Sequence, residues 1–108
     1  MPRVAVNEQA MIRVGSEDDV NVVLLRDISP GGACIRTDMR LNRAESVWIR
    51  VNAGTEDQFE LTATVVAVRE NPAGFYTDYG LRLVEMNLES ARSLGHFIEH
   101  RLGIAPAR

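Results

Sequence analysis

Residues 20–37 read VNVVLLRDISPGGACIRT, which is an apolar run, a proline-glycine break and a second extended run. The stretch Val20–Ile28 is rich in β-branched and other aliphatic residues, a composition that favours a long β-strand. Ser29-Pro30-Gly31-Gly32 interrupts it with the residue order of a type II turn, in which proline presets φ and the next glycine supplies a positive φ. Because Ala33–Thr37 resumes the extended pattern, the segment predicts a β-hairpin.

Apolar and polar residues also alternate on both sides of this hairpin, with the period of two that is typical of strands. Further strands are expected over residues 4–14, 47–51, 59–70 and 75–84, separated by polar or glycine-containing turns. Six twisted strands in so short a chain leave fewer exposed edges when the sheet closes on itself. The sequence therefore predicts a six-stranded antiparallel β-barrel.

The apolar spacing changes near the carboxyl end, from every second residue to every third or fourth, which indicates an amphipathic helix. Its expected apolar face consists of Leu88, Ala91, Leu94, Ile98 and Leu102. Asn87 is expected to cap its start and Gly103 its end. The sequence contains no recognisable internal repeat or linker. We therefore expect an all-β barrel with a C-terminal helix, which forms a single domain over residues 1–108.

Composition and charge restrict the function classes. The chain has 108 residues, of which 45% are hydrophobic and 25% charged, as in ordinary globular proteins. Twelve basic and fifteen acidic residues give a net charge of −3, which argues against a basic face for DNA. Every basic residue is arginine, whose planar fork suits phosphates, carboxylates and purine edges.

Cysteine content and hydropathy bear on location. The lone cysteine, Cys34, excludes an internal disulfide and a cysteine-based zinc site, and we expect it to pack as a small apolar residue. The sequence shows neither a signal-peptide pattern nor an apolar run long enough to span a membrane. We therefore expect a cytoplasmic protein.

The residues at the predicted hairpin turn allow two interpretations. Asp27 and Ser29 are two positions apart and so share one face of a strand, while Gly31 and Gly32 let a ligand approach the backbone. A carboxylate and a hydroxyl there can bind a donor-rich ligand such as a guanine edge. Alternatively, the two side chains cap the turn by bonding their own backbone, and the residues alone favour this local role.

The stretch Asp27-x-Ser29-x-x-Gly32 resembles the Asp/Asn-x-Ser-x-x-Gly motif of PilZ domains. The resemblance extends over essentially the whole chain, in an ordered series of segments: Arg3-Val4-x-Val6, Gly31-Gly32-Ala33-Cys34-Ile35, Val65-Val66-Ala67-Val68-Arg69, Tyr79-Gly80-Leu81-Arg82-Leu83 and residues 94–98. It implies a six-stranded barrel that receives the bacterial second messenger cyclic di-GMP.

The resemblance also implies roles for individual residues. In such domains an Arg-x-x-x-Arg pair before the first strand stacks on guanine and pairs with phosphate, and the Asp and Ser of the second motif hold the guanine edge. Carried over, Arg3, Asp27 and Ser29 would contact the ligand, and Gly31 and Gly32 would permit close approach. Arg3 matches the second arginine of the pair, whereas the first would precede Met1 and is absent from this sequence.

A second Arg-x-x-x-Arg spelling occurs at Arg36-Thr37-Asp38-Met39-Arg40, but it follows the hairpin instead of preceding the first strand. We interpret it as a coincidence on a solvated rim.

The implied function is that of a receptor, which transmits the level of the nucleotide to a protein partner in motility, adhesion and biofilm formation, or exopolysaccharide control. It needs no cofactor or metal, only the ligand cyclic di-GMP. The missing first arginine favours an alternative, in which a degenerate PilZ-like adaptor binds a protein partner without nucleotide.

Two weaker signals remain. His96-Phe97-Ile98-Glu99-His100 has the His-x-x-Glu-His spelling of one metalloprotease group, and histidines at this spacing could hold zinc on a helix face. No acidic residue follows to complete the ligand set, so we expect neither a metal site nor an enzyme. Trp48 alternates away from Val47 and Ile49, which leaves open a partner-facing position or burial under the helix.

Overall fold

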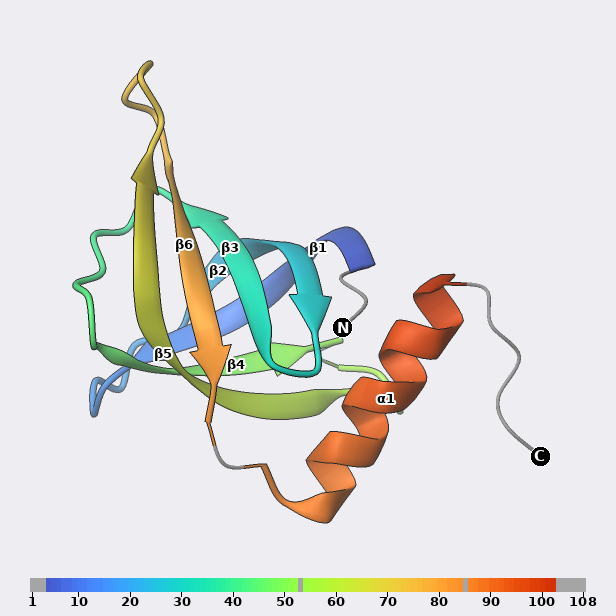
Figure 1. Cartoon of the computed structure of the whole chain (residues 1–108). Helices are drawn as coiled ribbons and strands as arrows, with labels where there is room; N and C mark the ends of the chain where they lie inside the picture. Colours follow the sequence, from blue (N-terminus) through green and yellow to red (C-terminus); the bar gives the residue numbers. More distant parts are fainter. Residues whose placement is uncertain (1–3, 53, 85, 103–108) are drawn as a thin grey trace.

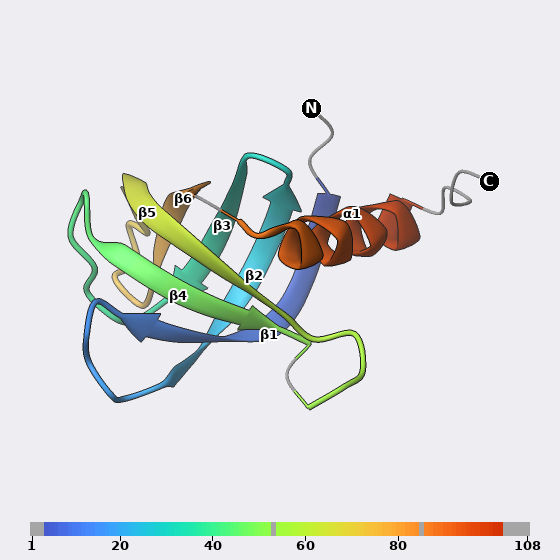
Figure 2. The ribbon, with the colours of Figure 1, turned by 90° about the horizontal axis from the view of Figure 1, so that it is seen from below.

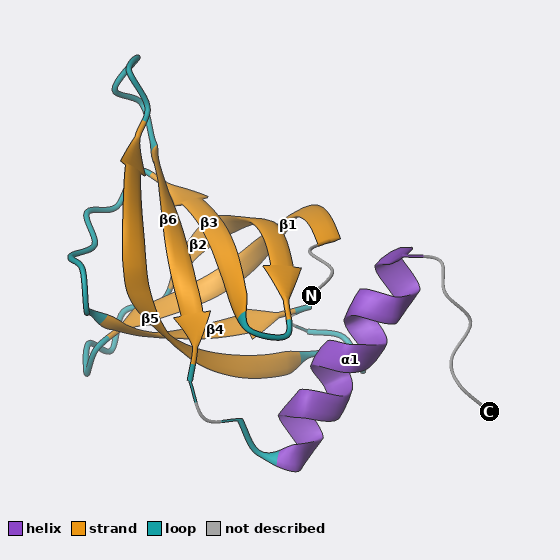
Figure 3. Ribbon diagram, viewed as in Figure 1, coloured by secondary structure: helices purple, strands orange, loops and turns teal. Residues whose placement is uncertain are grey.

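The computed structural model describes residues 4–52, 54–84 and 86–102, which form six strands and one helix (Figure 1, Figure 3). Their bounds are β1 Val4–Val14, β2 Asn21–Ser29, β3 Gly32–Thr37, β4 Ser46–Val51, β5 Phe59–Glu70, β6 Thr77–Leu83 and α1 Leu88–Leu102. The strands pair antiparallel in the order β1-β2-β3-β6-β5-β4, and β4 returns to pair with β1. The expected six-stranded barrel with a C-terminal helix is confirmed.

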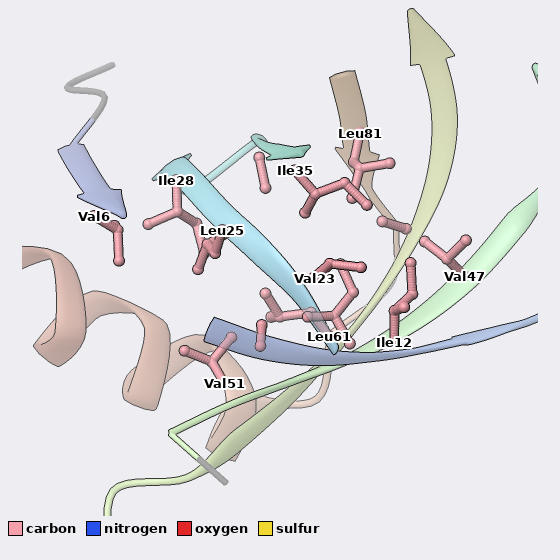
Figure 4. Close-up of a cluster of buried hydrophobic side chains, with 14 of the residues drawn as sticks. Val6, Ile12, Val23, Leu25, Ile28, Ile35, Val47, Val51, Leu61 and Leu81 are labelled. Atoms are coloured by element: carbon pink, nitrogen blue, oxygen red, sulfur yellow. The ribbon is translucent and has the colours of Figure 1, made fainter. Parts of the chain in front are cut away.

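The interior of the barrel is filled by every second side chain of each strand. Side chains from all six strands converge there (Figure 4), and they include Ile12, Leu25, Ile28, Ile35, Ile49, Leu61 and Leu81. Burying one such side chain contributes about 1.5–3 kcal/mol, so this interior is the main source of stability. The period-two pattern of the sequence is therefore the pattern of the core.

Two bulges interrupt the alternation at one end of the barrel. The β1–β2 register shifts between Ala5 and Glu8, where Asn7 adopts a φ of 52°, and the β2–β3 register shifts between Leu25 and Asp27. The Arg26 Nε donates a hydrogen bond of 2.8 Å to the Asn7 Oδ1 and so links the two bulges. The extra residue in β2 changes which of the following side chains face the core.

The β2–β3 turn differs from its prediction. Pro30 and Gly31 connect Ser29 to Gly32, which pair with each other, so the hairpin itself is as expected. Gly31 is not among the residues with a positive φ, and the predicted type II geometry is therefore wrong. Proline at the first turn position with a non-positive φ at the second is compatible with a type I turn, which needs no glycine there.

The start of α1 is capped as expected. The Asn87 Oδ1 accepts a hydrogen bond of 2.7 Å from the backbone N–H of Ser90, and the Asn87 carbonyl accepts one of 3.0 Å from Ala91. These bonds satisfy donors that the first helical turn would otherwise leave open. Gly103, the predicted C-cap, lies outside the described residues.

The buried face of α1 matches the prediction at Leu94 and Ile98 but not at Leu88 and Ala91, and it includes Phe97, which was not predicted. Leu94, Phe97 and Ile98 are buried, whereas Leu88 is 68% exposed and Ala91 is also exposed. The side chain of Leu102 lies outside the described part. The helix meets the barrel through its second half, beside β1 and β5 (Figure 2), and its first turn extends past the barrel surface. The sequence spacing could not show where along the helix this contact begins.

Aromatic and ionic contacts hold this second half in place. The Phe97 ring meets the Phe59 ring of β5 edge to face, with 5.5 Å between their centroids. Arg101 forms an ion pair with Glu8 of β1, and its guanidinium lies 5.0 Å from the centroid of the Phe97 ring. Phe97 is thus the centre of the contact between helix and barrel.

We predict that Phe97→Ala lowers the free energy of unfolding by about 3 kcal/mol, because it removes a buried ring and leaves a cavity. Leu88→Ala is the matched control, and it should change stability by less than about 0.5 kcal/mol because Leu88 is largely exposed. Urea denaturation of the two variants provides the measurement. Equal losses in both would contradict this orientation of the helix.

Candidate functional site

Asp27 and Ser29 lie near the end of β2, just before the β2–β3 turn. Ile28 between them is fully buried in the barrel, so the alternation of an extended strand directs its two neighbours toward the outer side. Asp27 is half-buried and Ser29 is 7% exposed. Without the bulge that precedes Asp27, the carboxyl would follow Val23 and Leu25 into the core.

The turn itself is held by two further hydrogen bonds. The Ser29 Oγ donates to the Gly32 carbonyl at 3.4 Å, which is the local bond that the turn-capping interpretation expects. The backbone N–H of Leu83 donates to the Gly31 carbonyl at 3.1 Å and ties the turn to β6. Gly31 is exposed, and a Cβ added to it would meet nothing within 4 Å. The turn is therefore fixed in place, with Pro30 and Gly31 exposed and Ser29 and Gly32 buried.

The strand registers define the surroundings of Asp27. Asp27 pairs with Ala5 on β1 and with Cys34 on β3, and Cys34 pairs in turn with Gly80 on β6. Cys34 and Gly80 each lie between two buried residues, so both face outward with Asp27. The residues that pair with Asp27, directly or through Cys34, therefore have short side chains or none, and Ala67 of β5 packs against Gly80.

Ser29 begins a second series of paired residues. It pairs with Gly32 of β3, Gly32 pairs with Arg82 of β6, and Arg82 pairs with Thr64 of β5. Arg82 is exposed and lies between Leu81 and Leu83, which places it on the outer side. The folded barrel thus brings an arginine next to the glycine turn, which the sequence reasoning did not identify.

Arg3 lies outside the described residues. Strand β1 begins at Val4, which pairs with Ile28, so the first strand starts beside Asp27 and Ser29. The start of β1 and the β2–β3 turn lie at the same end of the barrel in both orientations (Figure 1, Figure 2).

Arg36 is engaged in an ion pair. Its Nε and Nη2 donate to the two carboxylate oxygens of Asp78, at 2.8 and 3.0 Å, and its guanidinium lies 3.9 Å from the Tyr76 ring centroid. The hydrogen bond from Arg36 holds the pKa of the Asp78 carboxyl below its usual value. The first arginine of the Arg-x-x-x-Arg pattern at residues 36–40 is therefore already paired with a carboxylate and an aromatic ring.

Trp48 lies on the outer side of β4, half-buried between two arginines. The guanidinium carbons of Arg13 and Arg50 are 4.7 and 4.8 Å from its ring centroid, and its indole N–H donates to Glu60 at 3.2 Å. The hydrogen bonds from Arg50 and from Trp48 lower the pKa of Glu60. The partners of Trp48 come from β1, β4 and β5, so the indole ring lies among charged groups.

The histidines of α1 line a groove of about 540 Å³ between the helix and the β4–β5 loop. His96, His100 and Glu99 face it from the helix, opposite Glu56 and Asp57 of the loop. Within the described residues, no group of three or more histidine, cysteine or acidic side chains is placed to hold a metal ion. Nor does that part of the chain include a helix long and apolar enough to cross a membrane.

Comparison with known proteins gives one family and several similar structures. The family model described as PilZ domain matches residues 1–100. No curated protein matches the sequence. The PilZ domain of YcgR from Escherichia coli, solved with c-di-GMP, is 16% identical with a TM-score of 0.74, covering 94% of this chain and 88% of that one.

Two other solved structures are similar over most of this chain. The PilZ domain of CeSA from a cellulose-synthesizing bacterium is 19% identical with a TM-score of 0.64, covering 95% of this chain and 97% of that one. The inhibitor of motility MotI/DgrA from Bacillus subtilis is 18% identical with a TM-score of 0.69. The match covers 95% of this chain and 52% of that one. At these identities the likeness shows the shared fold, and this chain spans about half the length of MotI.

The lowered pKa of Asp78 predicts a pH dependence of stability. Its carboxyl stabilises the folded state when ionised, and the unfolded chain takes up the proton first as pH falls. The stability difference between wild type and Asp78→Asn should be constant above about pH 5 and shrink as pH falls below about 4. Urea titrations at a series of pH values test this, and a difference that does not vary with pH would contradict it.

Proposed function

The chain belongs to the PilZ domain family, and on this premise we propose that it is a cyclic di-GMP receptor that acts on a protein partner. The partner would control motility, adhesion and biofilm formation, or exopolysaccharide production. PilZ domains are receptor or adaptor domains and not enzymes, so we propose no catalysis for this chain. We propose further that residues 1–108 form a single domain that works in the cytoplasm.

The observation that carries the proposal is the outward position of Asp27 beside the glycine turn. A guanine edge presents adjacent N–H donors, and a carboxylate accepts from them in charge-assisted hydrogen bonds. Ser29, two residues further along β2, can accept or donate at the same edge. The side chains of Ala5 and Cys34, which flank Asp27 on the neighbouring strands, are short, and this favours the approach of a flat ring to the carboxylate.

Arg3 would supply a cation next to Asp27, from the start of the neighbouring strand β1. It is bonded to Val4, so its Cα is about 3.8 Å from the Val4 Cα, and Val4 pairs with Ile28. Its guanidinium is suited both to stacking on a purine and to a forked contact with phosphate. A ligand bound between Arg3 and the β2–β3 turn would hold the start of the chain against the barrel, and this would change the surface that a partner meets.

The second candidate function is that of an adaptor that binds a protein partner without nucleotide. The specific observation in its favour is the hydrogen bond from the Ser29 hydroxyl to the Gly32 carbonyl, which is compatible with a turn whose role is structural.

We predict that isothermal calorimetry detects cyclic di-GMP binding to the wild-type chain, and that Asp27→Ala weakens it about tenfold to a hundredfold. Alanine removes both carboxylate acceptors, whereas asparagine, which the family motif also allows at this position, would keep one. Arg3→Ala should weaken binding by a similar factor. The matched control is Asp19→Ala, which removes an exposed carboxylate before the opposite end of β2 and should bind like the wild type.

Thermal melts of all four proteins should first establish that each is folded. If folded wild-type protein gives no binding heat at high ligand concentration, the receptor proposal fails and the adaptor stands. If the wild type binds and Asp27→Ala binds equally well, the chain is a receptor but the site has been assigned to the wrong residues.

A further inference from the structure

The fold places an arginine of β6 beside the glycine turn, on the side away from the start of β1. We propose that Arg82 of β6 binds a phosphate of the cyclic dinucleotide, opposite the one that Arg3 serves. This inference rests on the proposed function, because it assigns a further contact in the same site. It identifies a binding residue that lies outside both sequence motifs.

The first support is position. Arg82 pairs with Gly32, which pairs with Ser29, and residues directly opposite in antiparallel strands have Cα atoms about 4.5–5.5 Å apart. Gly32, the residue between Arg82 and Ser29, has no side chain, so the Arg82 guanidinium can extend over it toward the glycine turn.

The second support is that the backbone of Arg82 is held on both sides. The neighbouring Leu83 donates its N–H to the Gly31 carbonyl at 3.1 Å, and Val84 donates to the Thr62 carbonyl at 2.9 Å. Arg82 itself pairs with Thr64 on the side away from the turn. A ligand that binds at the turn would thus find this arginine at a fixed distance, and little ordering of the backbone would be needed.

The third support is charge. Many arginines of the described part already have partners: Arg36 pairs with Asp78, Arg50 with Glu60, Arg101 with Glu8, Arg26 bonds Asn7, and Arg43 bonds the Val66 carbonyl. Among the described residues Arg82 forms no ion pair, and its cross-strand neighbours Gly32 and Thr64 are uncharged. An exposed guanidinium without a carboxylate can accept a phosphate without breaking an existing pair.

Together these observations give a two-sided arrangement. The ligand carries two phosphates and two purines, and the turn lies between the start of β1 and Arg82. One arginine on each side of the turn provides one cation per phosphate, in a chain whose net charge of −3 offers no general attraction for an anion.

Calorimetry with cyclic di-GMP at low and high salt tests the inference. Arg82→Ala should bind about tenfold or more weakly, with a smaller loss of affinity on adding salt, because one screened contact is gone. Arg82→Lys should retain most of the affinity, because an ammonium still pairs with a phosphate. Arg69→Ala changes the net charge equally but lies on β5 opposite Asp78, so it should bind within about twofold of wild type.

Thermal melts should again show that each variant is folded. Wild-type affinity and salt dependence in Arg82→Ala would overturn this inference and leave the receptor proposal intact. Equal losses in Arg82→Ala and Arg82→Lys, or in Arg82→Ala and Arg69→Ala, would also overturn it, since neither pattern fits a local phosphate contact. No binding by the folded wild type would instead defeat the receptor proposal, and this inference with it.

Discussion

Closure of the sheet through β1 is the constraint on which the rest of the structure depends. This strand pairs with β2 along one side and with β4 along the other, so the barrel has no open edge there. Closing a sheet of six short strands requires strong bending, and the bulges in β1 and β2 provide it at one end. The β2 bulge also turns Asp27 outward while Ile28 fills the core. The same local distortion therefore serves both the fold and the candidate site.

Electrostatics in this molecule act over short distances. The chain is acidic overall, and several of its arginines are bound to carboxylates, carbonyls or aromatic rings on the outer side of the barrel. Such pairs stabilise the pairing of particular strands, as Arg36 and Asp78 do for β3 and β6. A nucleotide phosphate would pair most readily with a guanidinium that has no such partner among the described residues, and Arg82 is an arginine of this kind that lies opposite Gly32.

The structural features that depend on local periodicity could be predicted from the sequence. The six strands, the β2–β3 hairpin and the Asn87 cap are confirmed because alternation, turn residues and capping chemistry act within a few residues. The type II turn and the Leu88 face of the helix were wrong, since neighbouring strands set the former and the docking position the latter.

Features that join distant segments could not be predicted. Arg36 and Asp78 are 42 residues apart, and Arg82 meets Gly32 only after β6 inserts between β3 and β5. The outward position of Asp27 depends on a bulge that the alternation of residues in β2 does not indicate. The roles of Arg3, Asp27, Ser29, Gly31 and Gly32 in ligand binding stay predictions.

The most direct test of this account is a nitrogen-15 NMR titration of the whole chain with cyclic di-GMP, read residue by residue. A ligand seated at the glycine turn should shift the backbone amides of Asp27, Gly31, Gly32 and Arg82, and leave those of Trp48 and His96 in place. Shifts confined to the groove of α1, or no shifts at all, would contradict it.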